Sequence, residues 1–189
     1  MNAPDRPVVP AAGLTVAEAP LSQFAPSLTN PKNRHSQEHL AAMAATIAPP
    51  GRVLQPITAR PWPATRGPAP AGVLMEIIIG EGRWRASELA GRDTIPFFWV
   101  EATDEQALVM QLAENIQRQA LTPLQEADGF RRLMQDHSYS ADQVAAKFEI
   151  SRSQVYGRLK LLDLCPAAPK EGAALSKVPA WPFPTGAKV

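Results

Sequence analysis

The sequence predicts an α+β protein in which a mixed half of strands and helices is followed by a purely helical half. Runs rich in β-branched and aromatic residues lie in the first half of the 189-residue chain. From Thr103 onward such runs are replaced by recurring helix-start signals. Proline resists helix and sheet interiors, and the 20 prolines gather in the first residues, in 49–70 and in 166–184. These three stretches are therefore predicted to be an arm, an inserted loop and a tail.

The composition is that of a soluble globular protein, with 45% hydrophobic and 20% charged residues. A formal net charge of +1 does not by itself indicate a nucleic-acid partner, so local charge has to carry that argument. The single cysteine, Cys165, excludes an internal disulfide framework and a multi-cysteine zinc site. No apolar run approaches the roughly 20 residues that cross a bilayer, and the first residues contain no signal core. We expect a cytoplasmic protein with no membrane partner.

Four stretches of the first half have strand character. They are 14–30, where a loop follows the strand, 53–60, 73–79 and 94–100. In the first stretch we expect the apolar side chains of Leu14, Val16, Leu21 and Phe24 to be buried. The insert 61–72 is too long and too rich in proline for a tight hairpin turn, so we expect a floppy excursion there.

Helices are predicted where capping residues precede an apolar stripe of helical period. The predicted helices run from Ser36 to Ile47, from Arg83 to Leu89, and near 104–118, 123–136, 141–148 and 152–163. Capping-box spacing marks four starts, in the pairs Thr103 and Gln106, Thr122 and Gln125, Ser140 and Gln143, and Ser151 and Gln154. Pro123 sits at a first helical position, where its missing N–H is harmless.

The segment 140–162, SADQVAAKFEISRSQVYGRLKLL, has the pattern of a helix-turn-helix. The small Ala145 allows two helices to cross closely, although Glu149 stands where the turn usually has glycine. The second helix leaves donor-rich side chains on or near its exposed face, and such side chains read base edges and phosphates. The predicted DNA-binding residues are Arg152, Ser153, Gln154 and Arg158. The alternative is a plain helical hairpin with a solvated charged face.

Two further stretches could bind an anion. GEGRWRASELAG, residues 80–91, follows an apolar strand and combines glycines, arginines and a helix start, the elements of a phosphate cradle. AENIQRQALTPLQEA, residues 113–127, places polar groups at the end of a helix. Taken singly, each stretch also fits a structural role, as a glycine turn with solvated arginines or a surface ion pair between Glu114 and Arg118.

Together and in order, these motifs resemble the ParB family. The first is similar to the family's GERRWRA signature and the second to its ENIQR signature followed by a proline. NPKNRHSQEHLAAMAATIAPPGRVLQPI resembles the family's opening loop, helix and strand, and the helix-turn-helix follows with SRSQV and LKLLDL. The resemblance extends from about Leu21 to Leu164, and four ordered motifs are far more specific than any one alone.

The resemblance implies a ParB/sulfiredoxin-like N-terminal domain that binds CTP with Mg²⁺, and a helix-turn-helix domain that binds double-stranded DNA. Nucleotide binding would gate a clamp formed by a homodimer through the N-terminal domain. The matching residues are Gly80, Glu81, Arg83 and Arg85 in the first motif and Glu114, Asn115, Gln117 and Arg118 in the second. Asn115 and Glu114 would approach the metal, and Glu114 would also act in hydrolysis as the catalytic residue. Gln55 and Pro56 match a loop near the base, and Arg34 matches the opening loop.

The implied domains are an arm over 1–20, the nucleotide-binding domain over 21–118, the helix-turn-helix domain over 119–164 and a tail over 165–189. The sequence departs from the family in three ways. Gly82 replaces a paired arginine, which removes a phosphate clamp. The insert interrupts a compact strand pair, and the tail lacks the pattern of the family's dimerisation domain. A sulfiredoxin activity is not expected, because the phosphate loop has no cysteine.

The predicted function is a sequence-specific, CTP-switched DNA-binding clamp in plasmid or chromosome partition, with weak CTPase activity as an open question. Such a protein would be associated with the nucleoid or a plasmid, and an ATPase of the ParA type would be its partner. One alternative is a ParB-like transcriptional regulator that does not hydrolyse nucleotide, which Gly82 favours. A ParB-like nuclease is the other, although only Glu81 and Glu114 could contribute carboxylates from these motifs.

Overall fold

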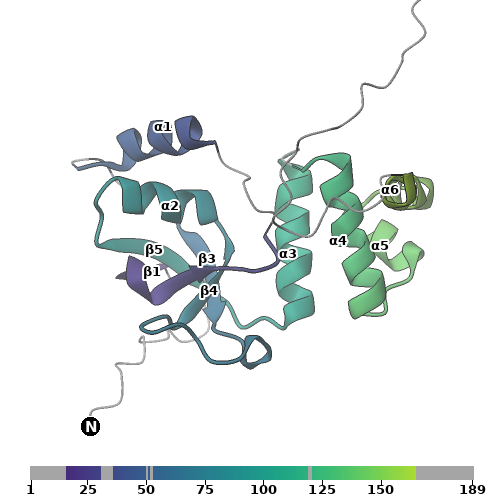
Figure 1. The fold of residues 1–189 in the computed structure, drawn as a ribbon, viewed down its shortest axis with the longest axis horizontal. Coiled ribbons are helices and arrows are strands. Elements are labelled where there is room, and N and C mark those ends of the chain that lie inside the picture. The colour runs from purple at the N-terminus through teal and green to yellow at the C-terminus, as the bar shows by residue number, and fades with distance from the viewer. Residues whose placement is uncertain (1–15, 31–35, 50, 52, 119–120, 165–189) are drawn as a thin grey trace, which may run out of the picture.

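The computed structural model describes residues 16–30, 36–49, 51, 53–118 and 121–164. In chain order the elements are β1 (Val16–Pro20), η1 (Leu21–Gln23), β2 (Phe24–Pro26), α1 (Gln37–Ile47), β3 (Ile57–Pro61), η2 (Ala64–Arg66), β4 (Met75–Ile79), α2 (Glu81–Leu89), β5 (Thr94–Trp99), α3 (Asp104–Gln117), α4 (Pro123–Asp136), α5 (Ala141–Phe148) and α6 (Arg152–Leu164). A sheet with helices is followed by a bundle of helices, so the α+β prediction is confirmed (Figure 1). Among the described helices, none combines the length and apolar character of a membrane span.

The five strands form one mixed sheet in the order β1-β5-β3-β4-β2. β1 pairs with β5 and β3 with β4 in antiparallel fashion, whereas β5 with β3 and β4 with β2 are parallel. An arm was predicted over 1–20, but Val16–Pro20 form β1 and belong to the sheet. Val16, which we expected to be buried, is 50% exposed, and Ala19 is buried at 5%. Alternation along the edge strand turns Ala19 inward instead. Leu14 lies outside the described residues.

Helices α1 and α2 lie together over the sheet (Figure 1). The hydroxyl of Ser36 accepts a hydrogen bond from the His39 N–H at 3.1 Å and caps α1, as the sequence predicts. Two buried side chains of α1, those of Ala44 and Ile47, pack in the same cluster as those of the strands. This core holds the β4–α2 connection against the sheet, and the candidate site is built on that connection.

The insert between β3 and β4 is anchored, which corrects the prediction of a floppy excursion. Trp62 Nε1 donates to the Gly67 carbonyl at 3.1 Å, and Thr65 Oγ1 donates to Asp104 Oδ2 at 2.6 Å. Arg66 approaches the buried carboxylate of Glu76 at 3.4 Å. The proline-rich composition correctly excluded a hairpin turn. It could not reveal these partners, because Asp104 is 39 residues along the chain from Thr65.

A buried arginine joins the sheet to the first helix of the second half. Arg60 is 2% exposed and donates from Nε to Glu76 Oε2 at 2.7 Å, from Nη1 to the Ala102 carbonyl at 2.9 Å, and from Nη2 to Asp104 Oδ1 at 2.5 Å. Glu76 is 1% exposed. The hydrogen bond from Thr65, followed by that from Arg60, lowers the pKa of Asp104 despite an opposing desolvation effect. Asp104 therefore remains a carboxylate, and the start of α3 is held on β3 and β4.

The helices of the second half begin where the sequence predicts. Reciprocal hydrogen bonds of a capping box are present at the starts of α3, α4 and α5, and the same pair of bonds joins Ser151 and Gln154. α3 and α4 approach closely at Gly129, where an added Cβ would lie 2.3 Å from Leu112 Cδ2. Phe130 and Phe148 stack in a tilted arrangement with centroids 5.6 Å apart. α3 thus contacts the sheet half from its first residue, through Asp104, to its middle, through Gln111, and it packs on α4 of the helical half.

We expect Arg60→Met to lower the free energy of unfolding by about 3–5 kcal/mol, because it removes the nearest cation from the buried Glu76 carboxylate and leaves, among the described residues, only Arg66 at 3.4 Å. Arg131→Met is the matched control. Arg131 is 45% exposed and pairs with Asp128, and removal of a surface pair costs roughly 0–1 kcal/mol. Urea unfolding of both variants measures the difference. Equal losses in the two variants would show that the buried cluster does not tie the domains together.

Candidate functional site

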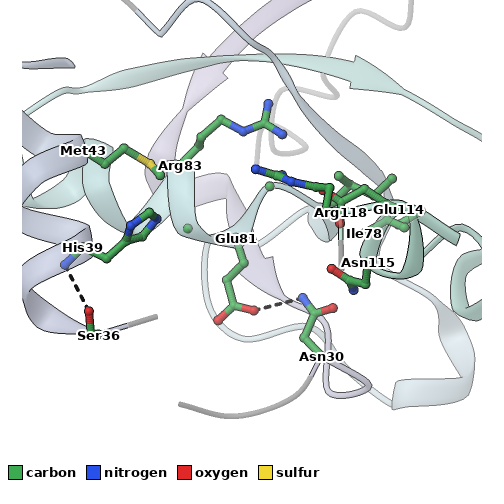
Figure 2. Close-up of a pocket in the computed structure, with 13 residues that line it drawn as sticks. Asn30, Ser36, His39, Met43, Ile78, Glu81, Arg83, Glu114, Asn115 and Arg118 are labelled. Atoms are coloured by element: carbon green, nitrogen blue, oxygen red, sulfur yellow. Dashed lines mark hydrogen bonds and ion pairs between the residues drawn. The ribbon is translucent and has the colours of Figure 1, made fainter. Parts of the chain in front are cut away.

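A pocket of about 540 Å³ lies where the β4–α2 connection meets the end of α3 (Figure 2). Its lining residues are Asn30, Ser36, His39, Met43, Ile78, Ile79, Gly80, Glu81, Gly82, Arg83, Glu114, Asn115 and Arg118. The volume is within the range of roughly 300–1,000 Å³ that small-molecule sites occupy. The two motifs that are far apart in the sequence therefore meet at one cavity.

Gly80 makes the turn that opens the pocket. Its φ of 97° is left-handed, and an added Cβ would lie 2.9 Å from Ile57 Cγ2, so both conformation and space require glycine. α2 begins at the next residue, and no side chain caps its N-terminus. The positive end of the helix dipole and its first N–H groups favour an anion at such a place.

Arg83 lines the pocket from the first turn of α2. Its Nη1 donates to the Gln55 carbonyl at 2.7 Å and also to the Pro56 carbonyl, so the two loop residues predicted to lie near a base are held by this arginine. The pKa of Arg83 is lowered first by burial and then by the charge of Arg118, and the carboxylate of Glu114 partly offsets both effects. In Figure 2 the Arg118 side chain extends from α3 toward Arg83.

This approach of two guanidinium groups is electrostatically unfavourable in the protein alone. Arg118 is bound to Glu114 by a contact of 2.7 Å between Nη1 and Oε1, which neutralises only part of the charge. A negatively charged ligand in the cavity would relieve the repulsion between Arg83 and Arg118. The pocket is therefore suited to an anion, with α2 and two arginines as its positive wall.

Asn115 supplies an oxygen acceptor to the pocket, in contrast to the positive charge of the two arginines. Its side chain is 3% exposed, and its Oδ1 atom has no hydrogen-bond partner among the described residues. Leaving a buried acceptor unsatisfied costs about 1–3 kcal/mol, so this oxygen is suited to a donor or cation supplied by a ligand. Glu114 is its neighbour on the pocket wall.

These residues fit a magnesium ion that is bound together with phosphates. The described part of the chain has no group of three or more His, Cys, Asp or Glu residues that could hold a metal alone. Mg²⁺, however, is often bound through one or two protein oxygens, substrate phosphates and water. The amide oxygen of Asn115 and the carboxylate of Glu114 provide those protein oxygens.

Glu81 is committed to protein contacts on both of its oxygens. Oε1 accepts from Arg85 Nε and Nη2 at 2.9 and 2.7 Å, and Oε2 accepts from Asn30 Nδ2 at 2.9 Å (Figure 2). Arg85 is thereby turned aside and does not line the cavity, and neither do Gln117 and the side chain of Gln55. Glu81 thus joins the first turn of α2 to the loop after β2.

Six lining residues were missed by the sequence reasoning, and two of them, Ile78 and Ile79, belong to β4, which was predicted as a strand without a site role. Asn30, His39 and Met43 were assigned no site role, and Ser36 was predicted only as a helix cap. They come from the loop after β2 and from α1, and no sequence spacing connects these segments to α2. Their proximity follows from the packing of α1 beside α2. Arg34 lies outside the described residues.

The helix-turn-helix is formed as predicted by α5, a turn and α6. Val144 and Val155 are fully buried between the helices, and Ala145 is 8% exposed at the crossing. Glu149 adopts the left-handed conformation, with φ 56° and ψ 38°, that glycine usually supplies in this turn. The cap of α6 fixes its first turn at the protein surface.

The predicted DNA-binding residues differ in their surroundings. Arg152, Ser153 and Gln154 are exposed at the start of α6. The Gln154 Oε1 atom accepts from the Ser151 N–H at 2.8 Å, so this amide also serves the cap. Arg158 is half-buried, and its Nε donates to Glu126 Oε2 of α4 at 2.6 Å. Arg158 therefore helps to hold α6 against α4.

Tyr156 is a surface residue that the sequence reasoning did not select. It is 43% exposed on α6, and the guanidinium carbon of Arg152 lies 5.6 Å from the centroid of its ring. Such a cation–π contact restricts the arginine without removing its charge. Arg152 also contacts Asp142 at 3.3 Å, and both side chains of that pair are well exposed.

Comparison with known proteins assigns both halves of the chain. Residues 9–116 match the family model of the ParB N-terminal domain, and residues 119–171 match that of the ParB HTH domain. The chromosome-partitioning protein Spo0J of Thermus thermophilus is 34% identical over 161 residues, which are 85% of this chain and 56% of the relative. The "Probable chromosome-partitioning protein ParB" of Pseudomonas putida is 42% identical over 134 residues, 71% of this chain and 43% of the relative. The chain spans about half the length of these curated relatives.

A solved structure agrees with this assignment. A crystal structure of the C-terminally truncated chromosome-partitioning protein ParB from Caulobacter crescentus, complexed to the centromeric parS site, has a TM-score of 0.58 at 31% identity. The match covers 79% of this chain and 73% of that one. A structure of the truncated protein with CTP-gamma-S is 33% identical over 80% of this chain and 81% of that one, with a TM-score of 0.48.

We expect Arg158→Ala to lower the free energy of unfolding by about 1 kcal/mol, because it removes a charge-assisted hydrogen bond between α6 and α4. Arg152→Ala is the control, since its ion pair is exposed and should contribute little to stability. Thermal unfolding of the two variants measures both effects. An Arg158→Ala variant as stable as the unaltered chain would rule out the structural task and leave Arg158 available to DNA.

Proposed function

The chain belongs to the ParB family, and we propose that it is a sequence-specific DNA-binding protein, switched by CTP, that acts in plasmid or chromosome partition. The observation that carries the proposal is the convergence of Arg83 and Arg118 at the open N-terminus of α2. The Asn115 Oδ1 atom, which has no partner among the described residues, lies beside them. These groups suit a phosphate chain with a bound cation. Asn115 and Arg118 lie at the end of α3, which packs on α4 next to the helix-turn-helix, whereas Arg83 lies on α2.

In this proposal the phosphates of CTP bind between the start of α2 and the guanidinium groups of Arg83 and Arg118. Asn115 and Glu114 hold Mg²⁺, which neutralises phosphate charge when it is bound. Glu114 would have a second task, in which its carboxylate orients a water molecule if the nucleotide is hydrolysed. The ParB motifs GEGRWRA and ENIQR support the choice of CTP, since they contain the pocket residues in the family's order.

The DNA partner is proposed to bind across the start of α6. Arg152, Ser153 and Gln154 are exposed there, and they offer donors to base edges and phosphates. The parS complex of the related Caulobacter crescentus protein supports a centromere-like site as the ligand. Arg158 contributes by holding α6 against α4.

α3 is the proposed route between the two sites. Its last turns bear Glu114 and Asn115, and its middle packs through Leu112 on Gly129 of α4. A ligand that pulls the end of α3 toward α2 would therefore shift the helical domain. A homodimer formed through the N-terminal domain would convert that shift into a clamp, and a ParA-type ATPase would act on the clamp at the nucleoid or on a plasmid.

A transcriptional regulator that binds DNA without hydrolysing nucleotide is the second candidate. Gly82 favours it, because this buried pocket residue of α2 brings no cation where the family signature has an arginine. A nuclease has less support. The described residues contain no cluster of three acidic or histidine side chains that could hold a catalytic metal.

The first functional prediction concerns nucleotide. CTP with Mg²⁺ should bind in preference to ATP, GTP and UTP, and Arg83→Ala should weaken it at least about tenfold, the loss typical of one charge-assisted contact. Gly82→Arg should tighten binding if position 82 faces the phosphates. Calorimetry with the four nucleotides measures each affinity.

Arg92→Ala is the matched control for this loss. Like Arg83, Arg92 donates to a backbone carbonyl of the same domain, Gly51 at 3.0 Å, but it does not line the pocket. Its removal should leave CTP affinity unchanged. No preference for CTP, or equal affinities of the Arg83→Ala variant and the unaltered chain, would remove the nucleotide switch and leave a DNA-binding scaffold.

The second functional prediction concerns DNA. Arg152→Ala should weaken binding by about 1–3 kcal/mol if it loses a base contact, or lower the salt slope by about one if it loses a phosphate contact. Fluorescence anisotropy at several salt concentrations separates the two effects. Arg131→Ala on α4 is a control for the loss of surface charge. Unchanged affinity and salt dependence in Arg152→Ala would count against this surface.

A further inference from the structure

The exposed face of α6 has a glycine at its centre. Ser153, Tyr156, Gly157 and Lys160 are all exposed, and their spacing of i, i+3, i+4 and i+7 places them on one side of the helix. Val155, on the opposite side, is fully buried in the core of the helical domain. Gly157 is the sixth residue of the helix Arg152–Leu164, far from both ends.

Nothing in the described fold requires glycine at this position. An added Cβ at Gly157 would meet no heavy atom within 4 Å, and Gly157 is absent from the described glycines with positive φ. Gly129 and Gly80 differ, since a Cβ there would meet Leu112 at 2.3 Å and Ile57 at 2.9 Å. Glycine inside a helix is destabilising compared with alanine, so the helix tolerates a cost at Gly157 that its own packing does not explain.

The neighbours of Gly157 show what kind of surface could come close. Arg152 and Lys160 place positive charge on either side of it along the helix, and Tyr156 provides an aromatic edge beside it. A glycine between cations allows the backbone of a helix to approach a polyanion without a side chain in between. Double-stranded DNA has that charge, and its major groove admits an α-helix.

We propose that Gly157 is the point of closest approach between α6 and the floor of the DNA major groove. The missing side chain then makes this position a determinant of specificity, because any Cβ would lift the helix away from the base pair opposite. The proposal rests on the DNA-binding function proposed above. It adds a residue that affects base recognition because its missing side chain lets the helix come close to the bases. Stability and affinity should consequently respond to substitution in opposite directions.

The test uses the full chain and duplex DNA that the unaltered protein has selected from a random pool. Gly157→Ala should raise the unfolding temperature, because alanine favours the helix. It should lower affinity for the selected duplex by roughly tenfold, the scale of one base contact. Gly157→Leu should lower it further. Affinity for a scrambled duplex, which reports phosphate contacts, should change little in either variant.

Gln135→Ala is the control, since Gln135 is exposed on α4 outside the proposed surface and should alter neither kind of DNA binding. Unchanged or tighter binding of the selected duplex by a folded Gly157→Ala variant would overturn the inference while leaving DNA binding intact. If the unaltered chain selects no sequence from the pool, the proposed DNA-binding function fails, and the assignment of Gly157 fails with it.

Discussion

The buried guanidinium of Arg60 is the contact on which the arrangement of the two halves depends. It bonds to Glu76 on β4, to the carbonyl of Ala102 and to Asp104 at the start of α3. A buried cation has to be paired, so the sheet and the first turn of α3 cannot separate without exposing or stranding a charge. Thr65 in the insert binds the same Asp104. One cluster therefore sets the direction of α3 and anchors the proline-rich loop.

The direction of α3 in turn decides both candidate sites. Its C-terminal turns bring Glu114, Asn115 and Arg118 to the pocket, opposite Arg83 of α2. Its buried face packs on α4, which carries the helix-turn-helix (Figure 1). A helix is stiff along its axis, so a force at the pocket end of α3 can act on α4, which packs against it. This shared helix is the physical basis for the proposed coupling between nucleotide and DNA.

The local rules of the sequence were sufficient for most of the fold. Capping pairs such as Thr122 with Gln125 act within one turn of helix, and all four predicted pairs form. The predicted strand over 73–79 likewise ends before Gly80, although the left-handed φ of this glycine is known only from the structure. The edge strand was harder. The burial of Ala19 rather than Val16 depends on which side of β5 the strand occupies, and a short alternating run does not specify that.

By itself, the sequence determined the helix starts, the strand-rich and helical halves, and the motifs that meet at the pocket, since each depends on residues close together in the chain. Only the tertiary structure decided what those residues do once folded. Arg158, which was predicted to lie on the exposed face of its helix, donates a hydrogen bond to Glu126, and Arg85 donates one to Glu81. Asn30 and His39 joined the pocket. In each case the partner comes from a different element, and side-chain contacts between elements depend on packing that local sequence patterns do not encode.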